Sequence, residues 1–142
     1  MPLHRLLYTS QSALPPTKGP LSEQVEQIAR KSSERNAVAG ITGVLLFVDG
    51  QFIQVLEGEA TPIEQTFERI CCSFDHEDVK LIDLVPIKAR MFGEWNMTLL
   101  SSERETSVQL LSEFEDIRFM TGVNAAAAVD QMRDCLKVAV PA

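Results

Sequence analysis

Gln54 places a neutral amide side chain between apolar side chains on one face of a predicted strand. In the segment 51–57 (QFIQVLE), strand alternation places Phe52, Gln54 and Leu56 on one face. A buried amide without hydrogen-bond partners costs roughly 1–3 kcal/mol, so Gln54 needs either a protein group or a ligand beside it. The position taken alone favours pairing with the backbone or a facing strand by about two to one. A ligand-facing amide is the alternative.

A phenol is the second side chain with possible chemistry. Tyr8 is the only tyrosine of the chain, and alternation in the segment 4–10 (HRLLYTS) places it on the same face as Leu6. Buried tyrosines usually belong to the core and find one partner for the hydroxyl. A phenol can also give up an electron and a proton, and an amide has both a donor and an acceptor with which to relay a proton.

Four further side chains have chemical uses, although each also has a common structural explanation. Asn36 follows a predicted helix, where asparagine is typical of a cap. Arg69 is typical of a solvated or paired surface arginine. Trp95 and Met97 alternate on a predicted strand and are typical of core packing. None of these residues indicates a function by itself.

The elements that position these residues follow the order strand, helix, strand, strand, helix, strand, strand. The predicted strands cover residues 4–10, 41–48, 51–57, 79–87 and 95–100. Asp49-Gly50 between two apolar runs predicts a tight hairpin turn. Ser22 is the expected cap of a first helix that ends near Arg35. Thr61 is the expected cap of a second helix, whose apolar stripe consists of Ile63, Phe67, Ile70, Cys71 and Phe74.

This order predicts an α+β fold with a ferredoxin-like βαββαββ sheet and both helices on one face. Two more helices are predicted at residues 102–114 and 124–138. They have no strands to join, so we expect them to cover the other face of the sheet. The domain division we expect is a sensory unit at residues 1–100 and a helical extension at residues 101–142.

Composition limits the possible functions. A chain of 142 residues with 45% hydrophobic and 23% charged residues is typical of one globular domain. Its net charge of -7 argues against direct binding to nucleic acid or to an anionic membrane surface. No signal sequence or membrane-spanning run is evident, so we expect a cytoplasmic location. Three cysteines without metal-ligand spacing predict reduced, mostly structural thiols and no metal site.

Four segments together resemble the BLUF family, blue-light sensors that use a flavin. They are HRLLYTSQS, RNAVAGITGVLLF, GQFIQVLEGE and FGEWNMTLL, which extend over about the first hundred residues. The resemblance implies a ferredoxin-like fold in which the isoalloxazine ring lies between the first two helices. It also implies a non-covalently bound flavin, usually FAD, with FMN as the other possibility.

The resemblance assigns roles to particular residues. Tyr8 is implied as the photochemical electron and proton donor, and Gln54 as the amide that bridges Tyr8 to the flavin N5 and C4 carbonyl. Trp95 and Met97 match a pair that exchanges places or shifts near Gln54 on illumination. The other implied flavin contacts are Ile28 and Ser32 with the ring, Arg35 with the ring or a phosphate, Asn36 with the C4 carbonyl and N3 edge, Arg69 near the C2 carbonyl, and His76. Ser73 departs from the family pattern, because some BLUF proteins have an acidic residue at the corresponding position.

The implied function is a photoreceptor without enzymatic activity. Light would rearrange the hydrogen bonds of Gln54, and the signal would pass through the strand at 95–100 and the C-terminal helices to a separate protein. The family suggests a homodimer or a larger homo-oligomer. One alternative is a flavin-free ferredoxin-like module that binds a small ligand or dimerises. Another is a small hydrolase of the acylphosphatase type using Arg69 and Asn36, although no glycine-rich phosphate loop precedes either helix.

Overall fold

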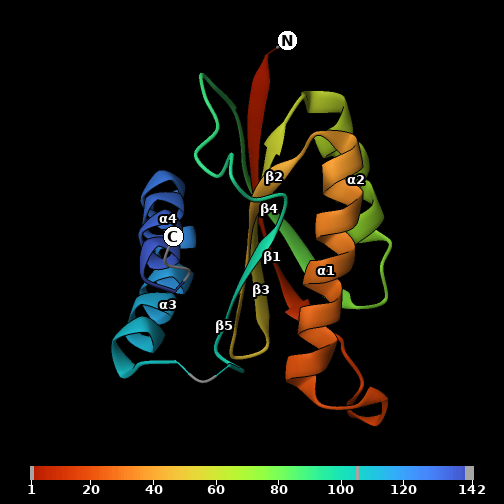
Figure 1. Cartoon of the computed structure of the whole chain (residues 1–142), viewed down its shortest axis with the longest axis vertical. Helices are drawn as coiled ribbons and strands as arrows, with labels where there is room; N and C mark the ends of the chain where they lie inside the picture. The colour runs from red at the N-terminus through yellow and green to blue at the C-terminus, as the bar shows by residue number, and fades with distance from the viewer. Residues whose placement is uncertain (1, 105, 140–142) are drawn as a thin grey trace.

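The fold is a mixed sheet with a pair of helices on each face (Figure 1). The structure is a computed structural model that describes residues 2–104 and 106–139. The strand order is β4-β1-β3-β2-β5, and β5 is parallel to β2. The strands are β1 (Leu3–Ser12), β2 (Thr42–Val48), β3 (Gln51–Gly58), β4 (His76–Ile87) and β5 (Thr98–Ser101). The helices are α1 (Leu21–Ala39), α2 (Ala60–Cys71), α3 (Val108–Thr121) and α4 (Ala125–Ala139), preceded by a short 3₁₀ helix, η1 (Pro16–Lys18).

The predicted fold class is confirmed, including the position of the C-terminal helices. Helices α1 and α2 cover one face of the sheet, and α3 and α4 cover the other (Figure 1). Within the described residues, no helix combines the length and apolar character that crossing a membrane requires. The same residues contain no group of three or more His, Cys, Asp or Glu side chains suited to hold a metal ion.

The turn between β2 and β3 sets the register of the central strands. Asp49 and Gly50 have φ angles of 47° and 78°, as the tight hairpin predicted from their sequence requires. The hairpin pairs Val48 with Gln51 and, further along the ladder, Leu45 with Gln54. Tyr8 of β1 pairs with Gln54 from the other side. The central amide therefore lies between two buried strands.

Strand alternation divides the core into two clusters. On β3, Phe52 and Leu56 contribute to the cluster beneath α1 and α2, as do Leu6 and Tyr8 of β1. The opposite cluster contains side chains of β2 and β3 together with α3 and α4. Its helical members include Leu110, Phe114, Ile117, Met132 and Leu136. Both faces of the central strands are thus buried, which explains why β2 reads as an almost continuous apolar run.

Both predicted helix starts were wrong. Helix α1 begins one residue before Ser22, and Pro20 occupies the N-cap position. Helix α2 begins at Ala60 with Glu59 as its N-cap, so Thr61 lies within the first turn. Proline is tolerated in a first turn, because its missing N–H would have no helical partner there. Neither helix therefore uses the hydroxyl cap that its sequence suggested.

Helix α1 continues for another turn beyond its predicted end. It stops at Ala39, because Gly40 takes the left-handed conformation at φ 71°. The N–H groups of Gly40 and Ile41 both donate to the Asn36 carbonyl. Asn36 was predicted to follow the helix, but it lies inside the last turn and is 2% exposed. Its side chain is therefore held on the sheet side of α1.

The apolar stripe predicted for α2 was only partly right. Ile63 is fully buried, and Phe67 and Ile70 pack against the core. Cys71 is exposed, and Phe74 is 96% exposed because α2 ends at Cys71 and the chain turns toward β4. The cysteines also differ from one another, since Cys135 is buried while Cys71 and its neighbour are exposed. The expectation of mostly structural thiols holds for Cys135 alone.

The last strand and the helix after it both start later than predicted. β5 begins at Thr98, because Trp95 closes a turn by donating its N–H to the Phe92 carbonyl. α3 begins at Val108 rather than at residue 102, and the Ser107 hydroxyl caps it by accepting from the Leu110 N–H. The Ser102 N–H donates instead to the Phe47 carbonyl, which extends the sheet by one more contact.

Candidate functional site

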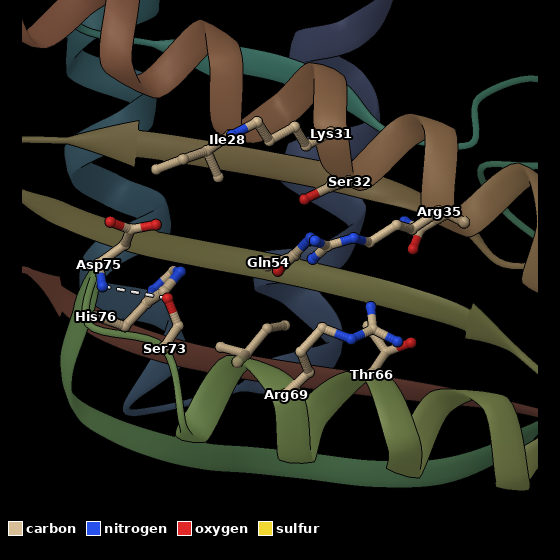
Figure 2. A pocket seen from close by; sticks show the side chains of 12 residues that line it. Ile28, Lys31, Ser32, Arg35, Gln54, Thr66, Arg69, Ser73, Asp75 and His76 are labelled. Carbon is tan, nitrogen blue, oxygen red and sulfur yellow. Dashed lines mark hydrogen bonds between the residues drawn. The ribbon is translucent and has the colours of Figure 1, made fainter.

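A cavity lies between α1 and α2 above the middle of β3 (Figure 2). Its empty space is about 580 Å³ when the open solvent at its mouth is included. Helix α1 contributes residues at helical spacing, namely Ile28, Lys31, Ser32, Arg35 and Asn36. Helix α2 and the turn after it contribute Thr66, Arg69, Ile70, Ser73 and Asp75, while Gln54 comes from β3 and His76 from the start of β4.

Gln54 forms the floor of the cavity and is 3% exposed. Its Oε1 accepts a hydrogen bond from the Tyr8 hydroxyl. Its Nε2 lies 3.3 Å from the Met97 sulfur. A thioether is a weak acceptor, so the amide nitrogen has no strong protein partner among the described residues. The amide thus retains donor capacity at the wall of an open cavity, which suits a ligand with an oxygen or nitrogen acceptor.

Tyr8 lies beside Gln54 on the neighbouring strand β1 and is fully buried. Burial is the largest cause that raises the pKa of its phenol above the ordinary value of 10.0, and the nearby Cys71 raises it further. The ring is 5.7 Å from that of Phe67 and 6.2 Å from that of His76, measured between centroids. The phenol is therefore neutral at physiological pH and its hydroxyl proton points at Gln54.

His76 closes one end of the cavity. Its Nδ1 lies 2.8 Å from the Ser10 hydroxyl, and its ring is 4.5 Å from that of Phe52 between centroids. Burial lowers the pKa of His76, and the neighbouring Asp75 carboxylate opposes that shift without cancelling it. The Asp75 N–H donates to the Ser73 hydroxyl, as the dashed line in Figure 2 shows. The imidazole is thus a mainly neutral wall of the cavity.

Three cations surround the mouth of the cavity. Lys31 and Arg35 reach it from α1, and Arg69 reaches it from α2 (Figure 2). All three side chains are exposed. None of them forms an ion pair within the part of the chain that the structure describes. In a chain of net charge -7, three uncompensated cations at one opening favour an anionic group there.

Asn36 joins the cavity wall to the segment that leads into β5. Its Nδ2 donates to the Asn96 carbonyl at 2.9 Å. In turn, the Asn96 Nδ2 donates to the Ile41 carbonyl at 3.1 Å. We call this pair of crossed amide contacts the Asn36–Asn96 clasp. It fixes the chain immediately before Met97, whose sulfur meets Gln54.

Trp95 and Met97 were predicted to share a face, and this was wrong. Met97 is buried in the cluster beneath α1 and α2, next to Gln54. Trp95 instead packs against the opposite cluster, with α3 and α4. The cause is local, because both residues precede β5 and the Phe92 turn breaks the alternation of a regular strand. Of the predicted pair, only Met97 lies at the site.

The structure brings together most of the residues that the sequence singled out. Tyr8 donates a hydrogen bond to Gln54 from the neighbouring strand. The predicted residues that line the cavity are Ile28, Ser32, Arg35, Asn36, Gln54, Arg69 and His76. Lys31, Thr66 and Ile70 also line it but were not predicted to do so. Helical spacing from Ile28 and Arg69 could have identified Lys31 and Thr66, and Ile70 follows Thr66 by four residues. Asp75 lies in a turn, and no periodic signal could have identified it.

Comparison with known proteins shows the family to which the chain is similar. A family model described as "BLUF: Sensors of blue-light using FAD" matches residues 3–98. The photoactivated adenylate cyclase subunit beta of Euglena gracilis is 35% identical over 102 residues, which are 71% of this chain and 11% of that protein. The chain thus spans about a tenth of the length of the curated relatives it matches first.

Solved structures agree with this match over more of the chain. The dark-state structure of BlrB, a BLUF protein, has a TM-score of 0.77 and 27% identity, covering 98% of each chain. A structure of Klebsiella pneumoniae BlrP1 with FMN and cyclic diGMP has a TM-score of 0.66 and 31% identity, and covers 80% of this chain and 29% of that one. The similarity to BlrB extends beyond residue 98 and includes the C-terminal helices.

Proposed function

The chain belongs to the BLUF family, the sensors of blue light using FAD, and we propose that Tyr8 and Gln54 perform its photochemistry. Family membership makes the chain a blue-light sensor that uses a flavin. The flavin-free alternative is therefore not favoured. The observation that carries our proposal is the buried hydrogen bond from the Tyr8 hydroxyl to Gln54 Oε1, at the floor of a cavity between two helices.

The residues present suit a flavin. Ile28 and Ile70 offer apolar side chains from opposite helices, which is what the faces of a planar ring require. Gln54 has an amide nitrogen whose protein partner is a weak thioether, so a ring carbonyl or nitrogen would satisfy it better. Arg35 and the other cations at the mouth suit the phosphate of a nucleotide flavin. The apolar, hydrogen-bonding and cationic side chains of the cavity thus support a flavin site between α1 and α2.

A flavin, when bound, supplies the absorption of blue light and the capacity to accept an electron. With the flavin bound, Tyr8 would donate that electron, and its hydroxyl proton would move to the Gln54 amide along the existing hydrogen bond. Return of the electron and the proton would restore Tyr8 and leave the Gln54 amide flipped or in its other tautomer. No product is released in this cycle, so we propose a receptor without enzymatic activity.

The other residues take supporting roles in this proposal. Asn36 would hold the polar edge of the ring at its C4 carbonyl and N3, and Arg69 would do so near its C2 carbonyl. Ile28, Ser32 and His76 border the ring, and Arg35 reaches the ring or a phosphate. Trp95 takes part only indirectly, because its side chain lies on the opposite face of the sheet.

We further propose that Met97 carries the signal out of the cavity. The Met97 sulfur is in contact with the Gln54 amide, and Thr98 begins β5 immediately after it. Any change in the amide must therefore alter the contact with Met97. β5 leads to α3 and α4, so a shift of Met97 can bias their packing on the sheet. A separate effector protein would read that change.

Several expectations from the sequence stay proposals. Residues 1–100 would form the sensory unit and residues 101–142 a helical extension. FAD would be the flavin, with FMN the other possibility, and the receptor would be a cytoplasmic homodimer or larger homo-oligomer. Relatives are named photoactivated adenylate cyclases, but this chain matches only 11% of the first of them, so cyclase activity is not assigned to it.

The experiment that tests the function uses the full chain loaded with flavin. We expect a yellow protein whose visible absorption shifts slightly to the red under blue light and returns in the dark. Tyr8→Phe keeps the shape of the ring and removes only the hydroxyl. It is expected to keep the flavin bound and to abolish the red shift, because the proton donor is gone.

Phe67→Leu is a matched control, because Phe67 touches the Tyr8 ring but has no group to transfer. We expect this variant to keep a red shift. An unchanged photocycle in Tyr8→Phe, with the flavin bound as in the wild type, would contradict the assignment of Tyr8.

A further inference from the structure

A second cavity lies where the connection between β4 and β5 meets α4, on the side of the sheet away from Gln54. Its empty space is about 790 Å³ when the open solvent at its mouth is included. Met91 and Trp95 line it from the connection, and Arg133 and Lys137 line it from α4. None of these residues lines the flavin cavity, so the two cavities are separate.

The apolar part of this second cavity is formed by Met91 and Trp95. Both side chains are half-buried and pack against the cluster that contains the core residues of α3 and α4. Each of them therefore has one surface held by the core and another that borders the cavity. An aromatic ring can stack on an indole, and a thioether adapts its shape to a neighbouring ring. This surface thus suits the planar apolar body of a small ligand.

Cations outnumber carboxylates around this apolar surface. Arg90, Arg133 and Lys137 line the cavity, and Glu94 is the one carboxylate among the lining residues. Arg133 pairs with carboxylates of its own helix that are more than half exposed, and such pairs are weak. Lys137 forms no ion pair within the residues that the structure describes. In a chain of net charge -7, this local balance favours an anionic ligand.

Arg90 is the cation whose position is best defined. Its guanidinium donates to the carbonyls of Gly40 and Glu57, at 2.8 and 3.0 Å, and to the Thr42 hydroxyl at 2.9 Å. It forms no ion pair with a carboxylate in the described part of the chain. A guanidinium has five N–H donors, so donors remain for the carboxylate of a ligand. The backbone thus holds a cation in place at this cavity.

We infer that this cavity binds a small aromatic carboxylate, with its ring on Trp95 and its anionic group toward Arg90 and the cations of α4. Trp95 precedes Met97 by two residues, and the Asn36–Asn96 clasp holds the chain between them. A ligand that holds Trp95 in place therefore stabilises the arrangement in which Met97 contacts Gln54. By linkage, it binds more tightly in the dark than under blue light. This coupling rests on the proposed function, whereas the binding itself does not.

The test uses the full chain loaded with flavin and the probe 2-naphthoate, with the neutral 2-naphthamide to isolate the effect of the charge. Trp95 is the only tryptophan of the chain, so its indole N–H resonance in a nuclear magnetic resonance spectrum reports directly on this cavity. We expect 2-naphthoate to shift this resonance with a Kd on the order of 0.1–1 mM. We expect 2-naphthamide to bind about fivefold more weakly or less tightly still.

Two variants test the contribution of the cations. Arg133→Gln and Lys137→Gln should each weaken the binding of 2-naphthoate about twofold to fivefold, because each removes one exposed cation. Neither should change the affinity for 2-naphthamide. Lys88→Gln is the matched control, because Lys88 is an exposed cation of the same connection and does not line the cavity. It should leave both affinities unchanged.

The coupling is measured by repeating the titration under blue light, where 2-naphthoate should bind about twofold more weakly than in the dark, or more weakly still. A Trp95 resonance that does not move at probe concentrations well above the expected Kd would overturn the inference, and so would equal affinities for the carboxylate and the amide. Equal affinities in the dark and in the light would overturn the coupling. Failure of the proposed function gives a different result, because the red shift would then be absent while 2-naphthoate still binds.

Discussion

At the scale of single residues, the site depends on one buried amide with unequal partners. Gln54 accepts a hydrogen bond from Tyr8 through Oε1, but its Nε2 meets only the Met97 sulfur. An amide with two strong partners would be locked in one orientation by their geometry. In Gln54, the oxygen has a strong hydrogen-bond partner, whereas the nitrogen has only a weak one. That asymmetry makes Gln54 the residue whose hydrogen bonds light can rearrange.

The resemblance implied that Tyr8 and Gln54 meet, whereas alternation within regular strands predicted only which neighbours on its own strand each residue shares a face with. The register between β1 and β3 then pairs Tyr8 with Gln54. Arg69 was also placed correctly, because helical spacing holds within α2. Asp75 could not be predicted, since the direction of a side chain in an irregular turn depends on tertiary contacts.

The buried phenol predicts a specific dependence of stability on pH. Burial raises the pKa of Tyr8 above its ordinary value of 10.0, so above that pH the unfolded chain loses this proton and the folded chain keeps it. The folded state then binds more protons, and the free energy of unfolding falls by about 1.4 kcal/mol per pH unit from this group. Urea unfolding at several alkaline pH values measures it.

Tyr8→Phe provides the reference for this measurement, since it lacks the titrating group. The difference in unfolding free energy between wild type and variant should be constant below pH 10.0 and should decrease above it. A constant difference up to the alkaline limit would mean that Tyr8 ionises equally in the folded and unfolded chain, which is incompatible with its burial.

At the scale of elements, the connection between β4 and β5 determines which side chain, Met97 or Trp95, contacts Gln54. The Glu57 carboxylate is 1% exposed and accepts hydrogen bonds from the N–H groups of Met91 and Phe92. The Trp95 carbonyl then accepts from Gly43, and the Asn36–Asn96 clasp follows. Hydrogen bonds to the rest of the protein therefore hold this irregular segment in place along its length, although it is neither helix nor strand.

These contacts explain why the sequence misplaced Trp95. The prediction assumed a regular strand from residue 95 to residue 100, in which Trp95 and Met97 must share a face. The segment instead takes its conformation from partners far away in the chain, chiefly Glu57 and Asn36. Local sequence patterns carry no information about such distant contacts, so only the tertiary structure could place Trp95.

The clasp leads to a prediction for Asn96. Asn96→Ala removes the hydrogen bond to the Ile41 carbonyl and leaves the carbonyl that Asn36 contacts. Flavin binding and the red shift should persist, because Tyr8 and Gln54 are untouched. The return to the dark state should slow by up to about fivefold, since a neutral hydrogen bond of ~1 kcal/mol that favours the dark position of Met97 is lost.

Glu94→Ala serves as the control for this change, because Glu94 is exposed two residues away in the same segment. Recovery of the dark absorption after a light pulse measures the rate. Equal recovery rates in Asn96→Ala and wild type would show that the clasp does not bias the position of Met97.

At the scale of the whole molecule, the sheet separates the light-sensing side from the helical side. Gln54 and Met97 face α1 and α2, whereas Val55 and Trp95 face α3 and α4. The C-terminal helices were predicted to cover this second face because they had no strands to join, and they do. The start of α3 was missed by several positions, since Ser102 extends the sheet instead of beginning a helix, whereas α4 starts within one residue of its predicted start.

The packing of α3 on the sheet predicts a strong effect of one core substitution. Phe114 is 1% exposed within the cluster that joins α3 and α4 to the sheet. Phe114→Ala should lower the free energy of unfolding by about 3–5 kcal/mol, because it leaves a cavity in that cluster. Urea denaturation followed by circular dichroism measures the change.

Phe119→Ala is the matched control on the same helix, because Phe119 is 70% exposed. It should change the free energy of unfolding by less than about 0.5 kcal/mol. Similar effects of the two substitutions would mean that α3 does not pack on the sheet through Phe114.

The central claim is that light changes the hydrogen bonds of Gln54 at the flavin. The infrared difference spectrum between illuminated and dark protein tests it most directly, because a stronger hydrogen bond lowers the stretching frequency of a carbonyl. We predict that the flavin C4 carbonyl band moves to lower frequency in the wild type and stays in place in Gln54→Leu with flavin bound. A band that does not move in the wild type, or that moves equally in Gln54→Leu, would contradict the account.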